Sequence, residues 1–223
     1  MMSTVDPLRP TGNFLLARFV RIIPAWVFRL LFRVRVIGAD RIPEGPYILA
    51  GNHISYADPM VLWCVSPKPV HFMAHSGLWK NPILGWGLSR LWAFPVQRQA
   101  ADRNALKIAE TLLKRGDPIG IFPEGTRNIE GTANPQQGAA FLALRTEAPI
   151  VPVGIAGTEL IKPPGARLIR FPRLTISYGQ PIDPSEIAVT DRKERIEVMT
   201  AMLMSRIAEE ISNASAHRTG RRD

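Results

Sequence analysis

Two short stretches contain side chains that could carry out chemistry together. In NHISYADP, His53 stands five positions before Asp58. An imidazole exchanges protons near neutral pH, and a carboxylate held against it fixes its tautomer and stabilises its protonated form. In FPEGTR, Glu124 supplies a second carboxylate and Arg127 a cation. The two stretches therefore indicate a pocket that combines a base with an anion-binding group.

The stretch with the histidine also has a purely structural interpretation. Asp58 followed by Pro59 is typical of a helix start, because the carboxylate accepts bonds from free backbone N–H groups and proline needs no donor in the first turn. On this interpretation Asp58 is the N-cap of a helix at 59–65. The two interpretations are compatible, and Asp58 is expected to cap its helix while it orients His53.

The elements that must position these side chains are visible as short apolar runs alternating with helical patterns. Strands are predicted at 34–37, 47–50, 70–73, 94–96, 119–122, 150–153 and 174–178. Helices are predicted at 59–65, 82–91, 102–115, 137–146 and 192–212. The alternation predicts an α/β fold with a largely parallel or mixed sheet flanked by helices.

Polar groups follow three of these predicted strands, and a fourth strand is broken by glycines. His53 and Glu124 follow two of them, AFPVQR leads to Arg98, and APIVPVGIAGT breaks at Gly154 and Gly157. Sheets of this class hold their binding groups beyond the strand ends. A single polar pocket with one base and two cations is therefore predicted.

The four stretches resemble the motifs of a known family. NHISYAD looks like the His-x4-Asp motif, and FPEGTR like the third motif, of the glycerolipid acyltransferase family, which includes 1-acylglycerol-3-phosphate acyltransferases. AFPVQR is similar to the second motif and IVPVGI to the fourth, in the family's order, and the likeness covers about residues 34–180. Trp92 and Gln97 depart from the usual pattern, since the second motif often has glycine and an acidic residue at these places.

The resemblance implies an acyltransferase of phospholipid synthesis. It implies that His53 is the general base that takes a proton from a hydroxyl of lysophosphatidate, with Asp58 orienting the imidazole. The hydroxyl then attacks an acyl thioester directly, and no acyl-enzyme forms. The donor is acyl-CoA or acyl carrier protein, and no metal or other cofactor is expected.

The resemblance also assigns the acceptor side of the pocket. Its residues are Glu124, Gly125, Thr126, Arg127 and Arg98. The carboxylate is expected to hold acceptor hydroxyls, and the two guanidinium groups to bind the phosphate, whose oxygens match their planar fork. Two alternatives stay open: an acyltransferase that uses glycerol 3-phosphate or another lysophospholipid, and a non-catalytic module that binds anionic lipid.

The amino-acid composition limits the type of protein, its cellular setting and its partner. With 46% apolar and 21% charged residues in 223, the chain is expected to fold as a globule with a sizeable core. The single cysteine, Cys64, cannot form an internal disulfide, which favours a reducing, cytoplasmic setting. The net charge of +9 indicates an anionic partner, and the absence of a recognised nucleic-acid-binding motif favours lipid over nucleic acid.

The positive charge is concentrated at the N-terminus. Residues 1–35 contain six arginines and one acid, and Arg18, Arg21, Arg29 and Arg33 share one side of a helical projection opposite aromatic and aliphatic residues. Such a segment suits peripheral or monotopic contact with an anionic membrane, here on its cytoplasmic face. Packing on the domain is the alternative. Pro24 is expected to kink the segment or divide it into two helices.

The predicted organisation has three parts: a membrane-associating segment at 1–35, an acyltransferase domain at 36–213 and a flexible basic tail at 214–223. Within the last helix, the methionines are expected to fill the core. The sequence disfavours two other chemistries. A zinc site with His71 and His75 is disfavoured because VHFMAH reads as a strand, and a serine hydrolase using Ser55 lacks a G-x-S-x-G elbow.

Overall fold

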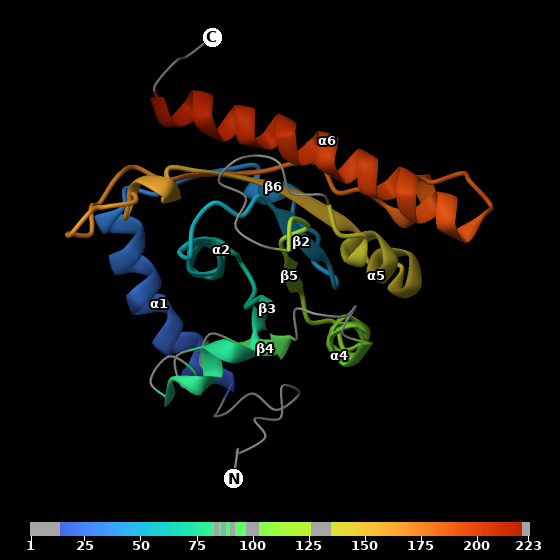
Figure 1. Ribbon diagram of the computed structural model, residues 1–223, viewed down its shortest axis with the longest axis horizontal. Helices are drawn as coiled ribbons and strands as arrows, with labels where there is room; N and C mark the ends of the chain where they lie inside the picture. The colour runs from blue at the N-terminus through green and yellow to red at the C-terminus, as the bar shows by residue number, and fades with distance from the viewer. Residues whose placement is uncertain are drawn as a thin grey trace.

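Figure 1 presents the computed structural model of the protein. It describes residues 14–82, 85, 88, 89, 92–96, 103–125 and 135–219, with side chains from Ile22 onward.

A seven-stranded mixed sheet forms the centre of the molecule, in the order β1-β7-β6-β2-β5-β3-β4. The strands are β1 (Arg35–Ile37), β2 (Ile48–Gly51), β3 (His71–His75), β4 (Ala93–Val96), β5 (Ile119–Ile121), β6 (Ile150–Ala156) and β7 (Thr175–Tyr178). The five strands from β6 to β4 are parallel, whereas β7 is antiparallel to β6 and parallel to β1. The α/β class, the mixed sheet and all seven strand positions are therefore confirmed.

Helices cover both faces of the sheet (Figure 1). They are α1 (Phe14–Leu31), α2 (Asp58–Val65), α4 (Arg103–Lys114), α5 (Gly138–Thr146) and α6 (Arg192–Thr219). One core cluster joins α1 and α2 to the sheet, and the other joins α4, α5 and α6 to its opposite face. Strand β6 is buried along all seven residues, as expected for an apolar strand covered on both sides.

Helix α6 crosses the sheet in very close contact. A Cβ atom at Gly154 in β6 would lie 2.1 Å from the backbone carbonyl of Glu210, so only glycine permits this approach. Met199 and Leu203 of α6 are almost fully buried, which confirms that this methionine fills the core. The tight crossing fixes β6, and with it the loop that follows at Gly157.

Helix α1 is one helix of 18 residues that continues through Pro24, so of the two expected effects of this proline the division into two helices does not occur. One predicted helix limit is wrong. Helix α6 continues to Thr219, so residues 214–219 are helical and do not belong to a tail. The helix predicted at 82–91 falls mostly on residues outside the described part. No described helix has both the length and the apolar character that a membrane span requires.

The five parallel strands end along one side of the sheet, which we call the carboxyl edge. Because β7 and β1 run the other way, both of them begin at this edge. The end of α1, which leads into β1, and the connection from β6 to β7 therefore lie there too. His53 follows β2 and Glu124 follows β5, and these are neighbouring parallel strands, so both also lie at the carboxyl edge.

Candidate active site

The loop that carries His53 is fixed to the sheet by the residue before it. Strand β2 ends at Gly51, and the buried amide of Asn52 then reaches across to β6. Its Nδ2 donates to the Ile155 carbonyl at 3.0 Å, and its Oδ1 accepts from the Ile155 N–H at 2.8 Å. The side chain thus continues the strand pairing for one more position and holds the start of the His53 loop in place.

Asp58 is the centre of the site's hydrogen bonding. It is fully buried, and its Oδ2 lies 2.9 Å from His53 Nδ1. The same oxygen accepts the backbone N–H groups of Ile54 at 2.8 Å and Ser55 at 2.7 Å. The hydroxyl of Thr158 donates to the other oxygen, Oδ1, at 2.6 Å. Four donors therefore fix this carboxylate, and only the imidazole among them is titratable.

These contacts correct the capping prediction. The N-cap of α2 is Ala57, whose side chain makes no capping bond, and Asp58 is the first residue of the helix. The backbone groups that Asp58 binds belong to Ile54 and Ser55, which precede it in the chain. Asp58 therefore orders the loop that carries His53 rather than the N-terminus of α2.

The ring of His53 is held on two sides. It stacks on Phe122 with the ring centroids 4.3 Å apart, and its side chain is 17% exposed. Since Nδ1 contacts Asp58, Nε2 is the ring nitrogen that remains to face a substrate. An imidazole held in this way can accept a proton at one fixed point.

Glu124 joins the same loop from β5. Its Oε2 accepts the backbone N–H of His53 at 3.4 Å, which brings the two motifs together as predicted. Gly125 follows in a tight turn, with φ at +66° and its N–H bonded to the Phe122 carbonyl at 2.9 Å. The predicted residues Arg98, Thr126 and Arg127 lie outside the described part of the chain.

Sequence reasoning missed Thr158, which lies 100 positions from Asp58. It is fully buried directly after β6, where Gly157 turns the chain with φ at +99°. The available signal was the rule already used for His53 and Glu124: a polar residue directly beyond the end of a parallel strand. Thr158 shares the carboxyl edge with both.

His71 and His75 lie on strand β3, in agreement with the sequence interpretation. Burial lowers the pKa of His71, whose ring stacks on Trp92 at 5.2 Å. Trp92 stands where the resembling motif often has glycine, and its φ of +60° lies in the left-handed region. A side chain in this conformation costs on the order of 1 kcal/mol. The backbone bend thus accounts for the glycine in that motif.

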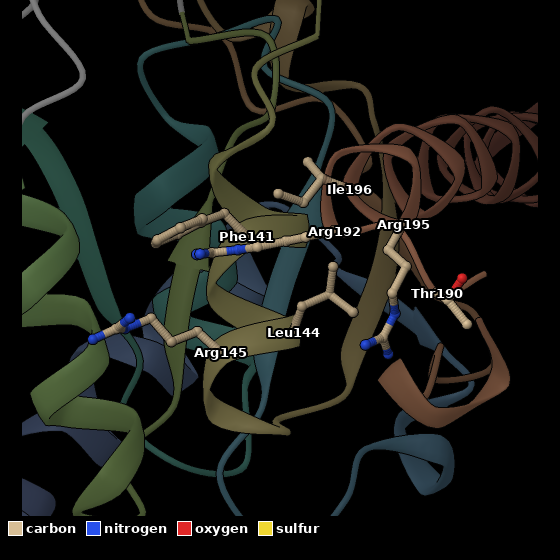
Figure 2. A pocket seen from close by; sticks show the side chains of 7 residues that line it. All are labelled: Phe141, Leu144, Arg145, Thr190, Arg192, Arg195 and Ile196. Atoms are coloured by element: carbon tan, nitrogen blue, oxygen red, sulfur yellow. The ribbon is translucent and has the colours of Figure 1, made fainter. Parts of the chain in front are cut away.

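A hollow of about 370 Å³ lies between α5 and the start of α6 (Figure 2). Its lining includes Arg145, Arg192 and Arg195; in Figure 2 the side chains of Arg145 and Arg192 extend to the left and that of Arg195 extends downward. Helix α5 leads into the beginning of β6, and α6 follows the end of β7, so this hollow lies at the opposite end of the strands from His53. It is therefore separate from the site described above.

An oriented imidazole at the carboxyl edge of an α/β sheet is an arrangement that suits the removal of a proton from a hydroxyl or a water molecule. Residues 33–156 match the Acyltransferase family, and the chain belongs to that family. It is 31% identical to the 1-acyl-sn-glycerol-3-phosphate acyltransferase of Bacillus subtilis, over 79% of this chain and 87% of that protein.

Two further comparisons agree with this membership. The 1-acyl-sn-glycerol-3-phosphate acyltransferase of Streptococcus pneumoniae is 33% identical over 66% of this chain and 55% of its own length. The crystal structure of the 1-acyl-sn-glycerophosphate acyltransferase PlsC from Thermotoga maritima has the same fold, with a TM-score of 0.69 and 23% identity, over 91% of this chain and 84% of that one. The protein is thus an enzyme of the acyltransferase type.

Proposed function

We propose that the protein transfers a fatty acyl group from a thioester, acyl-CoA or acyl carrier protein, to a hydroxyl of lysophosphatidate. The observation that carries this proposal is the pair of His53 and the buried Asp58, joined at 2.9 Å beside Glu124. The names of the relatives from Bacillus subtilis and Streptococcus pneumoniae support the choice of acceptor.

The reaction needs one base. Nε2 of His53 removes the proton from the acceptor hydroxyl as its oxygen attacks the thioester carbonyl carbon. The tetrahedral intermediate then collapses, the C–S bond breaks, and the sulfur leaves as a thiolate, which takes from the imidazolium the proton that came from the hydroxyl. Asp58 stabilises that imidazolium, as the carboxylate does in a Ser-His-Asp triad. No metal or further cofactor enters the reaction.

The acceptor is proposed to bind on the side of the third motif. Glu124 and the turn at Gly125 lie beside His53, and in the proposal they contact the acceptor hydroxyls. Thr126, Arg127 and Arg98 complete this side in the proposal. The two arginines bind the phosphate, because a guanidinium offers paired N–H donors to its oxygens.

Thr158 is proposed to act as a positioning residue through Asp58. Thr158→Val removes the hydroxyl with little change of shape and leaves Oδ1 of Asp58 without its donor, while Thr158→Ser keeps the bond. We expect the valine variant to lose about 1–3 kcal/mol of stability. It should also lower kcat about tenfold with KM unchanged, because the imidazole is less well oriented.

The check on Thr158 is a set of kcat and KM values measured well below each variant's Tm. Serine is expected to restore kcat. If valine and serine variants lose the same kcat, or if valine changes KM alone, then Thr158 does not act through the orientation of His53.

Helix α1 is proposed to bind the cytoplasmic face of the membrane. Its exposed large side chains are Ile22, Ile23, Trp26, Val27, Leu30 and Leu31. Ala25, and Phe32 just after the helix, are buried in the core cluster that contains the residues of α2, so the helix packs on the domain with one side and leaves its apolar side exposed. Both sequence alternatives thus have support, each on a different side of the helix.

Replacing two exposed residues tests this role of α1. Trp26 and Leu30 are 71% and 75% exposed, so Trp26→Ser with Leu30→Ser leaves the core intact. We expect the affinity for anionic vesicles to fall about tenfold or more, since burial of each side chain in lipid contributes about 1.5–3 kcal/mol. Sedimentation with vesicles measures the change. Unchanged binding would place the membrane surface elsewhere.

The substrate assignment is tested with a panel of acceptors and purified protein. Long-chain acyl-CoA or acyl carrier protein is supplied with lysophosphatidate, glycerol 3-phosphate, another lysophospholipid or monoacylglycerol, and products are identified by mass spectrometry. Lysophosphatidate is expected to be the best acceptor and monoacylglycerol, which lacks a phosphate, a poor one. A preference for another acceptor would revise the substrate, and absence of all products would favour a non-catalytic lipid-binding module.

A further inference from the structure

The loop at 162–173, KPPGARLIRFPR, exposes large apolar side chains. Leu168 is 79% exposed, Ile169 61% and Phe171 49%. Four exposed cations flank them, and the loop contains no acid; the cations are Lys162, Arg167, Arg170 and Arg173. A contiguous exposed apolar group indicates an interaction surface, and the surrounding charge requires an anionic partner.

Specific bonds hold this loop in shape. The Arg170 N–H bonds to the Ile161 carbonyl at 2.8 Å and closes the loop at its base. The guanidinium of Arg33 donates to the Phe171 carbonyl at 2.8 Å, and the Phe171 ring lies 5.2 Å from that of Phe32. The apolar side chains are therefore presented on an anchored scaffold, in contact with the end of α1.

The loop lies at the carboxyl edge, because it connects the end of β6 to the beginning of β7. The end of α1 lies beside it (Figure 1). Thr158, which contacts Asp58, stands only four positions before the loop begins. Tyr56, in the catalytic loop itself, is 77% exposed at this edge as well. The exposed apolar residues thus lie at the same edge of the sheet as the site that contains His53.

We propose that the loop at 162–173 is a second membrane-docking element, which inserts Leu168, Ile169 and Phe171 into an anionic leaflet while its arginines contact lipid headgroups. Each cation near an anionic surface adds an electrostatic attraction that salt screens. Insertion of the apolar side chains adds a contribution to the binding free energy that salt does not screen. Together with α1, the loop provides a second contact with the membrane at the same edge of the sheet. Two such contacts fix the orientation of the pocket relative to the bilayer. The inference rests on the proposed function in that the acceptor is a lipid.

Binding to vesicles in the absence of any acyl donor tests the loop. The full-length variant Leu168→Ser with Ile169→Ser is compared with wild type and with Val198→Ser, which removes an exposed apolar side chain from α6. With vesicles of phosphatidylglycerol and phosphatidylcholine, the partition coefficient of the double variant is expected to fall about tenfold. The Val198→Ser control should bind like wild type, and all three should share one Tm.

A fluorescent label reports insertion directly. Ile169→Cys, labelled with the environment-sensitive dye NBD, is expected to shift to the blue and brighten on anionic vesicles, and to stay unchanged on vesicles of phosphatidylcholine alone. Cys64 is buried, and wild-type protein treated in the same way gives the background. The double variant Arg167→Gln with Arg170→Gln should lose much of the dependence of binding on salt.

Two results would overturn the proposal. The first is that the folded double variant binds vesicles as well as wild type does and that the NBD fluorescence does not change when vesicles are added. The second is self-association in solution that the double variant abolishes while vesicle binding is unchanged, because the loop would then cover a second copy of the chain. Since no acyl donor is present, the vesicle experiment tests the role of the loop in membrane binding independently of the acyltransferase activity. If the acceptor panel fails while the loop inserts, only the substrate assignment is wrong.

Discussion

His53→Ala is expected to lower the rate of acyl transfer by about 10²–10⁴, which is the usual contribution of a general base. The fold should survive, because the removed side chain is partly exposed, at 17%, and stacks on Phe122 beyond the end of β5. Asp58 keeps the donors from Ile54, Ser55 and Thr158, so the variant does not leave a buried carboxylate without partners.

The matched control for this variant is His75→Ala. His75 is also on the carboxyl edge, at the end of β3, where its Nδ1 accepts the N–H of Gly77 at 3.2 Å. It is expected to keep most of the activity. Steady-state rates with a saturating thioester, together with the Tm of both variants, test whether the loss of activity is specific to His53 and occurs without unfolding. Near wild-type turnover in His53→Ala would remove the mechanism.

Two substitutions of Asp58 separate its charge from its hydrogen bonds. In Asp58→Asn, the amide oxygen can take the place of Oδ2 and keep the bonds to His53 and the loop, while the hydroxyl of Thr158 turns to accept from the amide nitrogen. We expect kcat to fall about 10²-fold, because the imidazolium loses its opposite charge. Stability should change little.

Asp58→Ala is expected to have a larger effect on both quantities. It leaves the loop N–H groups and the buried hydroxyl of Thr158 without their acceptor. The loss of stability should be about 2–5 kcal/mol, and activity should fall at least as far as in His53→Ala. Chemical denaturation and kcat measurements on both variants test this order. Equal stability of the alanine variant and wild type would contradict the hydrogen-bond account.

The fold could be predicted because the apolar runs are short, regular and bounded by turn residues. Where the prediction failed, local composition was ambiguous. Residues 213–219 of α6 are small or polar and resemble a frayed end, yet Ala214 is fully buried and the helix continues. Pro24 indicates a break in a helix, but α1 continues through it, with Ala25 and Phe32 buried against the domain.

Only those site residues that stand directly after a predicted strand could be brought together from the sequence. His53 and Glu124 stand directly after buried strands, and parallel pairing of β2 with β5 brings them together. Thr158 could not be paired with Asp58 from the sequence, because this contact depends on β6 lying on the other side of β2. Asp58 before Pro59 has the same local pattern whether it caps α2 or orders the preceding loop. The structure distinguishes these two roles.

Coupled detection of lipid product and free thiol tests the central claim most directly. Wild type and His53→Ala are each incubated with lysophosphatidate and a long-chain acyl thioester in anionic vesicles. The account predicts phosphatidate and thiol in equal amounts from wild type and the loss of both from the variant. Thiol release with free fatty acid in place of phosphatidate, or equal product from the two proteins, would contradict it.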